Sequence, residues 1–376
     1  MKIGVIGVGR LGICFALLLE KAGYTVLGSD LREEYVANLK QKKIVTNEPQ
    51  VEALLANSKH IDFVVGNNEV ISQCDIIYIM VATPSTTDGS YDITAVNYVV
   101  DDLLKHDIRD KVIVIGCTVN PGDSLQIQER IRHLGAHVLY NPEFIAQGSI
   151  ISDLQKADLV LIGGESQDIM IRYAMLYNDI QTTTPNVHLM SLTAAEVTKI
   201  AVNCFLTTKI SYANLVGQVL IKAGLHNDVP KVLKAIGSDT RVGSKYMNFG
   251  FGFGGPCLPR DNRAFGNYTS SFGIDFNLGK TVDDFNKDHL QFLTSYVIEK
   301  NTHHLPFYFK YITYKPNTDI MDESQQYQLC KELLRRGYQV VIEDNEKIPE
   351  RIRNELGTSV RFVESIQCAD YYYIPF

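Results

Sequence analysis

The most constraining feature of this sequence is a glycine-rich turn between a short apolar segment and an amphipathic one. Ile3–Ile6 has the pattern of a buried strand and Leu11–Lys21 that of a helix, and the turn between them reads Gly7-Val8-Gly9-Arg10-Leu11-Gly12. Glycines at this spacing permit a tight turn and let a pyrophosphate approach backbone N–H groups at a helix N-terminus. The turn therefore predicts a dinucleotide-binding βαβ unit, with Gly7, Gly9, Arg10, Leu11 and Gly12 at the cofactor.

Asp30 completes this pattern at the end of the next predicted strand, Thr25–Ser29. A carboxylate about 20 residues after the glycines can bind the ribose hydroxyls and repel a 2′-phosphate, which favours NAD over NADP. Arg32 follows two residues later and could weaken this preference. We expect Arg32 to be a solvated cation at the start of a helix, so NAD is the predicted cofactor.

The first half of the chain continues to alternate between strands and helix-length segments. Short apolar strands separated in this way predict a parallel, doubly wound sheet of the Rossmann type. The polar stretch Thr83–Asp92 is expected to form a loop at the carboxyl end of a strand. The later strands are predicted at Phe63–Val65, Ile76–Val81, Val112–Gly116, His137–Leu139 and Leu159–Ile162.

The pattern changes near Ser191, where a long helix is expected. Thr193 could cap this helix with Glu196 three residues later, and the helix could run to about Lys222. A helix of this length usually spans between domains or forms an oligomer seam, and we expect a homodimer. From near His304 another strand, helix and strand follow, at Phe307–Ile312, Glu323–Arg336 and Gln339–Glu343. We therefore predict an α/β protein with a Rossmann domain (1–190), a central long-helix dimerisation region (191–300) and a smaller C-terminal α/β domain (301–376).

Composition excludes several classes of protein. The net charge is −7 and the chain has no dense Lys/Arg block, which argues against nucleic-acid binding. Seven scattered cysteines without CxxC spacing, and nine histidines without ligand spacing, predict reduced thiols and no metal site. No apolar run reaches the length of a membrane helix, and the N-terminus lacks a signal-peptide pattern. We expect a cytoplasmic protein that does not bind membranes.

The most informative segment in the chain is 250–261, Gly-Phe-Gly-Phe-Gly-Gly-Pro-Cys-Leu-Pro-Arg-Asp, which we call the cysteine loop. Glycines at this density bring the backbone close to a ligand or require positive φ. Cys257 at the end of such a loop, with Asp261 four residues later, is a candidate exposed nucleophile. A small buried side chain in a structural turn is an equally good interpretation of the loop alone.

Together with other segments, these motifs resemble those of the UDP-glucose/GDP-mannose dehydrogenase family, and the resemblance covers nearly the whole chain. The resemblance is carried in order by the glycine turn, Thr83-Pro84, Cys117-Thr118-Val119, Asn141-Pro142-Glu143-Phe144, Glu196–Asn203, Arg241-Val242-Gly243, the cysteine loop and Thr313–Asp319. It implies an NAD-dependent, four-electron oxidation of a nucleotide sugar's primary alcohol to a uronate. UDP-glucose is the expected substrate and polysaccharide biosynthesis the expected use of the product.

The resemblance also implies roles for single residues. Cys257 would form a thiohemiacetal and then a thioester. Lys199 and Asn203, one helical turn apart, would stabilise the developing oxyanion, and Asp261 would orient Lys199 or a water. Glu143 and Thr118 would handle the proton and the water during hydrolysis. Thr83 and Thr118 are expected at the cofactor, and the predicted substrate contacts are Glu143, Phe144, Lys199, Asn203, Arg241, Tyr246, Gly254 and Lys315, with Arg241 reaching the partner subunit's substrate.

Some positions depart from the family pattern. Gln147 stands where a second acid is usual after Asn141–Phe144, and Ile320, Asp322 and Tyr311 replace expected residues of the last third. The resemblance also leads us to expect an arginine and a final helix beyond the tail 369–376. Three alternatives therefore stay open: a dehydrogenase of UDP-N-acetylhexosamine or GDP-mannose, a two-electron alcohol or hydroxyacid dehydrogenase with a structural Cys257, and a catalytically impaired paralogue that binds nucleotide.

Overall fold

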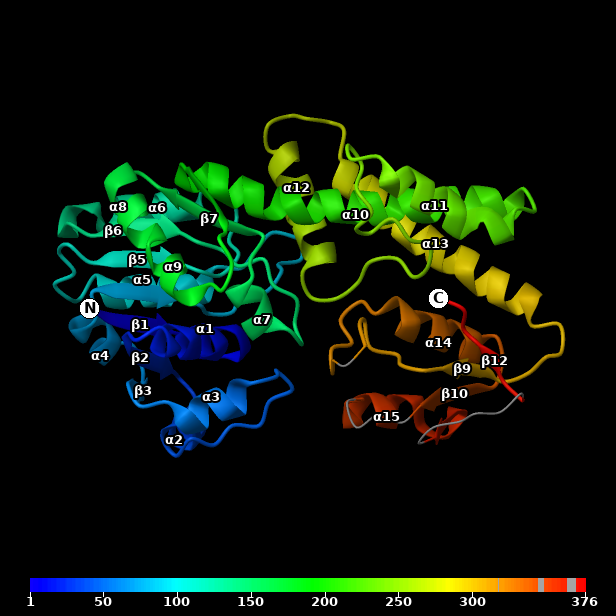
Figure 1. Cartoon of the computed structure of the whole chain (residues 1–376), viewed down its shortest axis with the longest axis horizontal. Helices are drawn as coiled ribbons and strands as arrows, with labels where there is room; N and C mark the ends of the chain where they lie inside the picture. The colour runs from blue at the N-terminus through cyan, green and yellow to red at the C-terminus, as the bar shows by residue number, and fades with distance from the viewer. Residues whose placement is uncertain (317, 344–347, 364–369) are drawn as a thin grey trace. The chain divides into compact units, whose positions relative to one another are not determined.

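The chain forms two compact units, Met1–Lys199 and Ile200–Phe376, in a computed structural model that describes residues 1–316, 318–343, 348–363 and 370–376 (Figure 1). Asn317 of the Thr313–Asp319 motif and Ala369 of the tail lie outside the described residues. The division into domains 1–190, 191–300 and 301–376 stays a prediction.

The first unit is built on an eight-stranded sheet of order β3-β2-β1-β4-β5-β6-β7-β8. Strands β1 to β6 all run parallel to one another, as the alternating sequence pattern predicts. Strand β8 was not predicted from the sequence, because its side chains are exposed or half-buried and leave no apolar pattern. The strands are β1 Lys2–Ile6, β2 Thr25–Asp30, β3 Ile61–Val65, β4 Ile76–Ile79, β5 Val112–Ile115, β6 His137–Tyr140, β7 Leu159–Gly164 and β8 Asn186–Met190.

Helices cover both faces of this sheet (Figure 1). Consecutive strand residues belong to opposite cores: Ile77 packs in one cluster and Tyr78 in the other. This alternation, with both faces apolar, is what a doubly wound sheet requires. The helices of the unit are α1 Arg10–Lys21, α2 Glu33–Lys40, α3 Val51–Asn57, α4 Asn68–Gln73, α5 Thr94–Leu103, α6 Asp123–Ile131, α7 Ile150–Gln155, α8 Gln167–Ala174 and α9 Leu176–Ile180, with a 3₁₀ turn at Arg132–Leu134.

Strand β7 corrects the expectation of a wholly parallel sheet, because it runs antiparallel to β6. The only helix between these two strands is α7, whose 6 residues rise about 9 Å along its axis, too little to return the chain across the sheet. The connection therefore stays at the carboxyl edge of β6. This keeps the segment Asn141–Phe144 at the same edge as the glycine turn.

The helix α10, Leu192–Lys222, corrects the predicted capping box. It begins before Thr193, so Thr193 lies inside its first turn and does not cap it. Glu196 is fully buried and its carboxylate accepts hydrogen bonds from the backbone N of Gly122 at 2.6 Å and of Ser124 at 2.7 Å. Glu196 thus anchors α10 to the first turn of α6 instead of closing its own helix end.

The second unit combines helices with a four-stranded parallel sheet of order β11-β10-β9-β12. The predicted strand, helix and strand are present, but the first strand ends at Phe309 rather than Ile312. Strands β11 and β12 were not predicted. The elements are α11 Val229–Ser238, α12 Leu258–Ser270, α13 Leu278–Lys300, β9 Phe307–Phe309, α14 Gln325–Arg335, β10 Val340–Glu343, α15 Glu350–Leu356, β11 Val360–Val363 and β12 Tyr372–Tyr373, with 3₁₀ turns at His226–Asp228 and Gly357–Ser359.

Candidate active site

The glycine turn has three positions with three different surroundings. Gly7 has φ +91°, which favours glycine, and a Cβ there would lie 2.7 Å from the Met80 backbone oxygen. A Cβ on Gly12 would lie 2.1 Å from the Gly7 oxygen, whereas a Cβ on Gly9 would meet nothing within 4 Å. Gly7 and Gly12 are therefore required by the fold, and Gly9 leaves open space beside the N-terminus of α1. This is the cradle that a dinucleotide pyrophosphate needs.

Asp30 ends β2, with its side chain 11% exposed. Both of its carboxylate oxygens accept hydrogen bonds from Arg32, from Nε and from Nη2, each at 2.8 Å. Burial alone would raise the pKa of Asp30, but its hydrogen bonds and charge interaction with Arg32 outweigh burial and lower it. The carboxylate is thus ionised and already held in place at the position where ribose hydroxyls are expected.

Thr83 and Thr118 are brought together, as a shared cofactor role requires. Thr83 follows β4 and Thr118 follows β5, and the Thr83 hydroxyl donates to the Thr118 carbonyl oxygen at 2.7 Å. Thr83 is buried and Thr118 is half-buried. Both lie at the carboxyl edge of the sheet, where open α/β folds bind their ligands.

Lys199 is buried and faces the segment Asn141–Phe144 from α10. Its Nζ donates to the backbone oxygen of Glu143 at 2.8 Å and lies 4.6 Å from the ring centroid of Phe144. Only 7% of Lys199 is exposed, so it is not an ordinary surface lysine. A buried cation held in this way is able to stabilise an anionic oxygen.

Glu143 is half-buried, and burial raises the pKa of its carboxyl to about 7 against the opposing effects of Lys199 and Tyr177. The Tyr177 hydroxyl lies 3.4 Å from Glu143 Oε1 and also donates to Asn141 Oδ1, which accepts from Tyr173 as well at 2.5 Å. A carboxyl with a pKa near neutrality can both accept and return a proton. Tyr173 and Tyr177 were missed at the sequence level because α8 and α9 look like ordinary core helices.

Gln147, which stands where the family pattern usually has a second acid, contacts the glycine turn. Its Oε1 accepts a hydrogen bond of 2.8 Å from Nη1 of Arg10. An amide at this position cannot take or give a proton as a carboxylate would. The arrangement leaves Glu143 as the acid that this segment contributes.

In the second unit, Cys257 is exposed and stands at the N-cap position of α12. The other five described cysteines are buried. The N-terminal end of a helix favours negative charge, which suits a thiolate nucleophile. Exposure at this position favours the nucleophile interpretation over a structural cysteine.

Asn203 and Asp261 form a buried pair in the same unit. Asn203 Nδ2 donates to Asp261 Oδ2 at 2.6 Å, and only 9% of Asn203 and 3% of Asp261 are exposed. Asp261 lies in the first turn of α12, and its backbone N donates to the Cys257 oxygen at 2.9 Å. The pair thus fixes the helix turn that carries Cys257.

Glycines of the cysteine loop lie close to neighbouring protein atoms, a requirement for small side chains that the sequence analysis did not predict. A Cβ on Gly252 would lie 1.9 Å from Asn286 Oδ1, and one on Gly254 would lie 2.4 Å from the Glu323 backbone oxygen. Among the loop's glycines Gly255 alone has positive φ, +83°, and its N donates to the Asp322 oxygen at 2.8 Å. The loop is therefore held tightly against α13 and the segment before α14.

His289 of α13 is a further residue that the sequence did not reveal. Its Nε2 lies 2.7 Å from the Gly250 oxygen and its Nδ1 2.7 Å from Gln218 Nε2. A carbonyl oxygen only accepts, so Nε2 carries the proton and Nδ1 accepts from Gln218. Burial lowers the pKa of His289 to about 4, which keeps the ring neutral and the cysteine loop anchored.

The remaining predicted substrate residues differ in exposure. Arg241 has an 88% exposed side chain held by Asp239, Tyr246 is exposed with φ +65°, and Lys315 is half-buried. The Lys315 carbonyl oxygen accepts hydrogen bonds from the hydroxyls of Thr313 and Thr318, each at 2.9 Å. The Lys315 backbone is thus held by two hydroxyl groups, whereas Arg241 extends from the surface of its unit.

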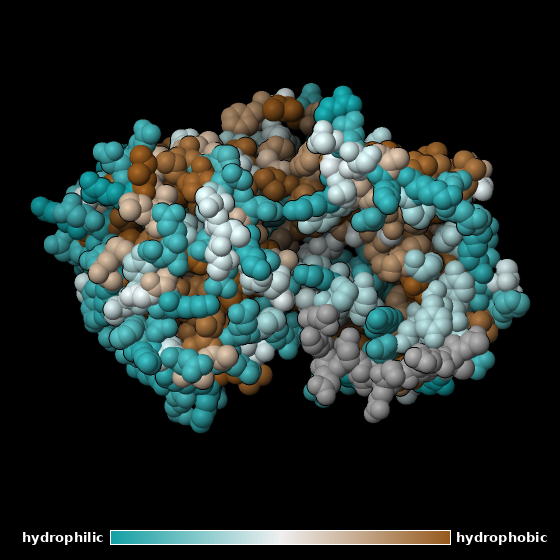
Figure 2. Space-filling view, in the orientation of Figure 1, coloured by the Kyte–Doolittle hydropathy of each residue, from teal (hydrophilic) through white to brown (hydrophobic). Residues whose placement is uncertain are grey.

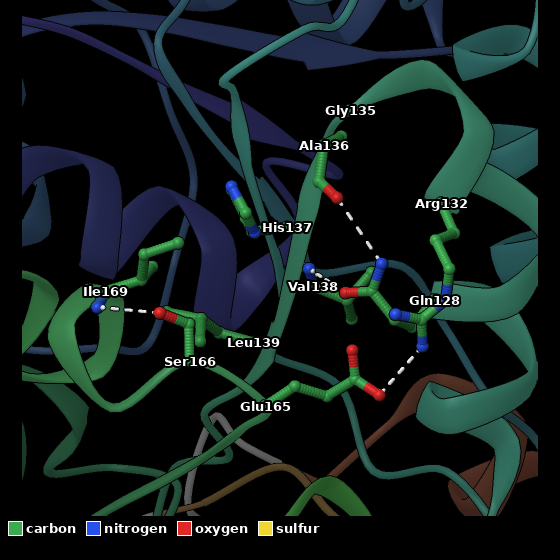
Figure 3. A pocket seen from close by; sticks show the side chains of 10 residues that line it. All are labelled: Gln128, Arg132, Gly135, Ala136, His137, Val138, Leu139, Glu165, Ser166 and Ile169. Carbon is green, nitrogen blue, oxygen red and sulfur yellow. Dashed lines mark hydrogen bonds and ion pairs between the residues drawn. The ribbon is translucent and has the colours of Figure 1, made fainter.

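A pocket of about 280 Å³ lies elsewhere in the first unit, among α6, β6 and the turn before α8 (Figure 3). Arg132 pairs there with Glu165 at 2.8 Å, and Gln128 forms hydrogen bonds with the backbone of Ala136 and Val138. His137, which begins β6, lines this pocket, so it opens at the edge of the sheet opposite to the glycine turn. None of the candidate site residues line it.

Within the described ranges, no group of three or more His, Cys, Asp or Glu side chains is arranged to hold a metal ion. In that same part of the chain, no helix has the length and apolar character needed to cross a bilayer.

Two family models match the sequence of this chain. The family model of the UDP-glucose/GDP-mannose dehydrogenase NAD binding domain matches residues 1–181, and that of the central domain matches 193–288. A UDP-glucose 6-dehydrogenase of Pseudomonas aeruginosa is 28% identical over 383 residues, covering 98% of this chain and 83% of the relative.

Solved structures agree with the sequence matches. A UDP-glucose dehydrogenase from the hyperthermophilic archaeon Pyrobaculum islandicum superimposes with a TM-score of 0.85 at 28% identity, covering 97% of this chain and 86% of that one. A UDP-D-ManNAc dehydrogenase from Pyrococcus horikoshii has a TM-score of 0.77 at 22% identity, covering 91% and 83%, and shows a shared fold.

Proposed function

This chain belongs to the UDP-glucose/GDP-mannose dehydrogenase family, and we propose that it oxidises UDP-glucose to UDP-glucuronate through a thioester on Cys257. As a member it is an NAD-dependent nucleotide-sugar dehydrogenase. The main support for the proposed thioester is that Cys257 is exposed at a helix N-cap while the other described cysteines are buried.

The overall reaction converts one primary alcohol, one water and two NAD⁺ into a carboxylate, two NADH and three protons. NAD supplies the hydride acceptor, and Gly7, Gly9, Gly12 and Asp30 would hold it. Loss of the first hydride and of the hydroxyl proton leaves an aldehyde. The Cys257 thiolate then adds to the aldehyde carbon, and the resulting thiohemiacetal loses the second hydride to become a thioester.

Charge must be stabilised at one oxygen throughout this sequence. The alkoxide, the thiohemiacetal oxygen and the tetrahedral species of hydrolysis are all more anionic than the groups they come from. We assign their stabilisation to Lys199 Nζ and Asn203 Nδ2, whose residues lie one turn apart on α10. The burial of Lys199 supports this assignment, because an oxyanion gains most from a cation that water does not screen.

Hydrolysis of the thioester needs a base for the attacking water. Glu143, with a pKa of about 7, is suited to accept that proton, and Thr118 to orient the water. The water oxygen bonds to the acyl carbon, the C–S bond breaks, and the Cys257 thiolate is regenerated. With Gln147 in the place of a second acid, Glu143 carries this step.

We further propose that the protein works as a homodimer. Helix α10 presents exposed apolar side chains at helical spacing in the second unit: Phe205 is 67% exposed and Val219 59%, with Tyr212 and Leu215 between them. Figure 2 shows apolar surface gathered over the helices of this unit and over the connection between α12 and α13. A stripe of this kind marks an interaction surface. Arg241, whose side chain is exposed, would reach the substrate of the partner subunit.

The reaction is proposed to take place in the cytoplasm, which suits five buried thiols. Measurement of NADH formed per sugar consumed tests the proposed function, with UDP-glucose, UDP-N-acetylhexosamines and GDP-mannose as substrates. We expect two NADH per UDP-glucose and UDP-glucuronate as product. One NADH per sugar would indicate a two-electron dehydrogenase, and no NADH with any sugar nucleotide would overturn the proposal.

A further inference from the structure

Arg32 is exposed at the start of α2, as the sequence suggested, but it is also paired with a carboxylate. Its guanidinium binds both oxygens of Asp30, and its backbone N also donates to Asp30 Oδ1 at 3.1 Å. The Arg32 side chain is nevertheless 61% exposed. One side of the guanidinium is thus committed to the ribose-binding carboxylate while most of the side chain faces solvent.

Tyr35 fixes this arrangement beside the glycine turn. Its hydroxyl donates to the Val8 oxygen at 2.9 Å, and the Arg32 guanidinium carbon lies 4.1 Å from the centre of its ring. A cation over an aromatic face is attracted to it, and the contact restricts the rotamers of a long side chain. The position of Arg32 is therefore set by two contacts on different elements rather than by solvent.

The pairing changes the electrostatics of the adenosine end of the site. An unpaired carboxylate at this position disfavours NADP because it repels the 2′-phosphate. Here the carboxylate is joined to a cation, so the pair has no net charge. A guanidinium has five N–H donors, of which Arg32 uses Nε and Nη2 on Asp30, and phosphate is a preferred acceptor for the others.

We propose that the Asp30–Arg32 pair lets this site accept a ribose 2′-phosphate, so that the protein binds NADP as well as NAD. Asp30 retains the geometry for ribose hydroxyls, and Arg32 supplies the charge that a 2′-phosphate needs. Glu33 and Glu34 in the first turn of α2 oppose a second anion. NAD accordingly remains the better ligand, and the discrimination between the two is moderate.

Equilibrium binding to the full-length protein tests this inference without a sugar nucleotide, so its outcome is separate from that of the proposed function. The dissociation constants of NAD and NADP, and of ADP and adenosine 2′,5′-bisphosphate, are measured by calorimetry at low and moderate salt. We expect the dissociation constant of NADP to lie within about tenfold of that of NAD. The Arg32→Ala change should raise the dissociation constant of NADP by roughly tenfold or more and that of NAD by less than about threefold. The loss should be greatest at low salt.

Arg130→Ala is the matched control, because Arg130 is also a surface arginine of the first unit paired with an aspartate, Asp101 at 2.6 Å. It removes the same charge away from the glycine turn and should leave the NADP-to-NAD ratio unchanged. Two results would overturn the proposal: NADP binding more than about 100-fold weaker than NAD in the unaltered protein, or an Arg32→Ala variant with an unchanged ratio. Thermal melting of both variants verifies that they are folded.

Discussion

The two units contain sheets with the same winding. In the first unit β1 is followed by β2 and β3 on one side and β4 on the other, and in the second unit β9 is followed by β10 and β11 on one side and β12 on the other. Both sheets thus have a switch point beside their first strand, where open α/β folds bind ligands. The shared topology by itself does not say which ligand each sheet takes.

The connection after the first strand distinguishes the two sheets. Only residues 7–9 separate β1 from α1, and Gly9 leaves open space for a pyrophosphate at the helix N-terminus. Residues 310–324, which include Lys315, separate β9 from α14, and Tyr314 and Glu323 of this longer connection lie next to Gly255 and Gly254 of the cysteine loop. We infer that the first sheet serves the dinucleotide and the second the sugar nucleotide.

The largest effect is expected for Cys257→Ser, a change in the second unit that tests whether the chemistry can be lost without loss of dinucleotide binding. It should reduce uronate formation by at least about 10³-fold, because the thiol is the proposed nucleophile, while the affinity for NAD stays unchanged. Product analysis and NAD titration measure the two quantities. Cys330→Ala, at a cysteine buried in the core of the second sheet, is the control and should retain turnover. Unchanged turnover in Cys257→Ser would exclude covalent catalysis.

Glu143→Gln tests whether the pH dependence originates in the first unit. With a pKa of about 7, Glu143 is protonated below neutrality and becomes a base above it, so thioester hydrolysis should speed up as pH rises through 7. In the Glu143→Gln variant the rate of thioester hydrolysis should no longer rise through pH 7, and at pH 8 it should be about 10²-fold lower than in the unaltered protein. Single-turnover rates from pH 5.5 to 9 measure the effect. Glu165→Gln, which changes an exposed acid of the same unit, is the control and should keep the rise of the rate through pH 7.

Gly9→Ala separates binding from folding in the first unit. A methyl group at Gly9 meets no protein atom within 4 Å and φ is −66°, so the melting temperature should not change. The methyl would occupy the space of the pyrophosphate, and NAD affinity should fall about 30-fold, equivalent to two hydrogen bonds of ~1 kcal/mol each. Gly250→Ala in the second unit also meets only ordinary contacts and should leave NAD affinity intact. Equal losses in both variants would contradict the division.

Lys315→Ala should have the smallest effect, confined to the sugar nucleotide. Removal of one charged contact is expected to raise KM for UDP-glucose by about tenfold, with kcat and NAD affinity nearly unchanged. Steady-state kinetics with each substrate varied in turn provides the measurement. A change in NAD affinity of similar size would mean that the second sheet contributes to the dinucleotide site.

The sequence predicted the parts of the molecule that have a strict local pattern. The glycine turn and the strands up to β6 were confirmed, because apolar strands buried on both faces leave continuous apolar runs. The reversed direction of β7 was not predicted, since strand direction depends on the path of the connection rather than on the strand. Strand β12 was missed because a pair of tyrosines near the end of the chain has no periodicity to detect.

The candidate site was predicted to a smaller extent. The residue types came from the motifs, but the contacts that position them did not, because they join distant segments: Tyr177 with Glu143, and His289 with Gly250. The capping role of Thr193 and Glu196 was wrong, since a local spacing rule was overruled by a tertiary partner for the carboxylate. Arg32 shows the same limit, because its pairing with Asp30 depends on geometry that the sequence does not display.

Intact-protein and peptide mass spectrometry provides the most direct test of covalent catalysis. The Glu143→Gln variant, in which hydrolysis is slowed, is mixed with UDP-glucose and NAD and quenched in acid within a single turnover. The prediction is that the peptide carrying Cys257 gains the mass of a UDP-glucuronyl group, in step with two NADH released per enzyme. NADH production without any adduct at Cys257, or with the adduct on another residue, would contradict it.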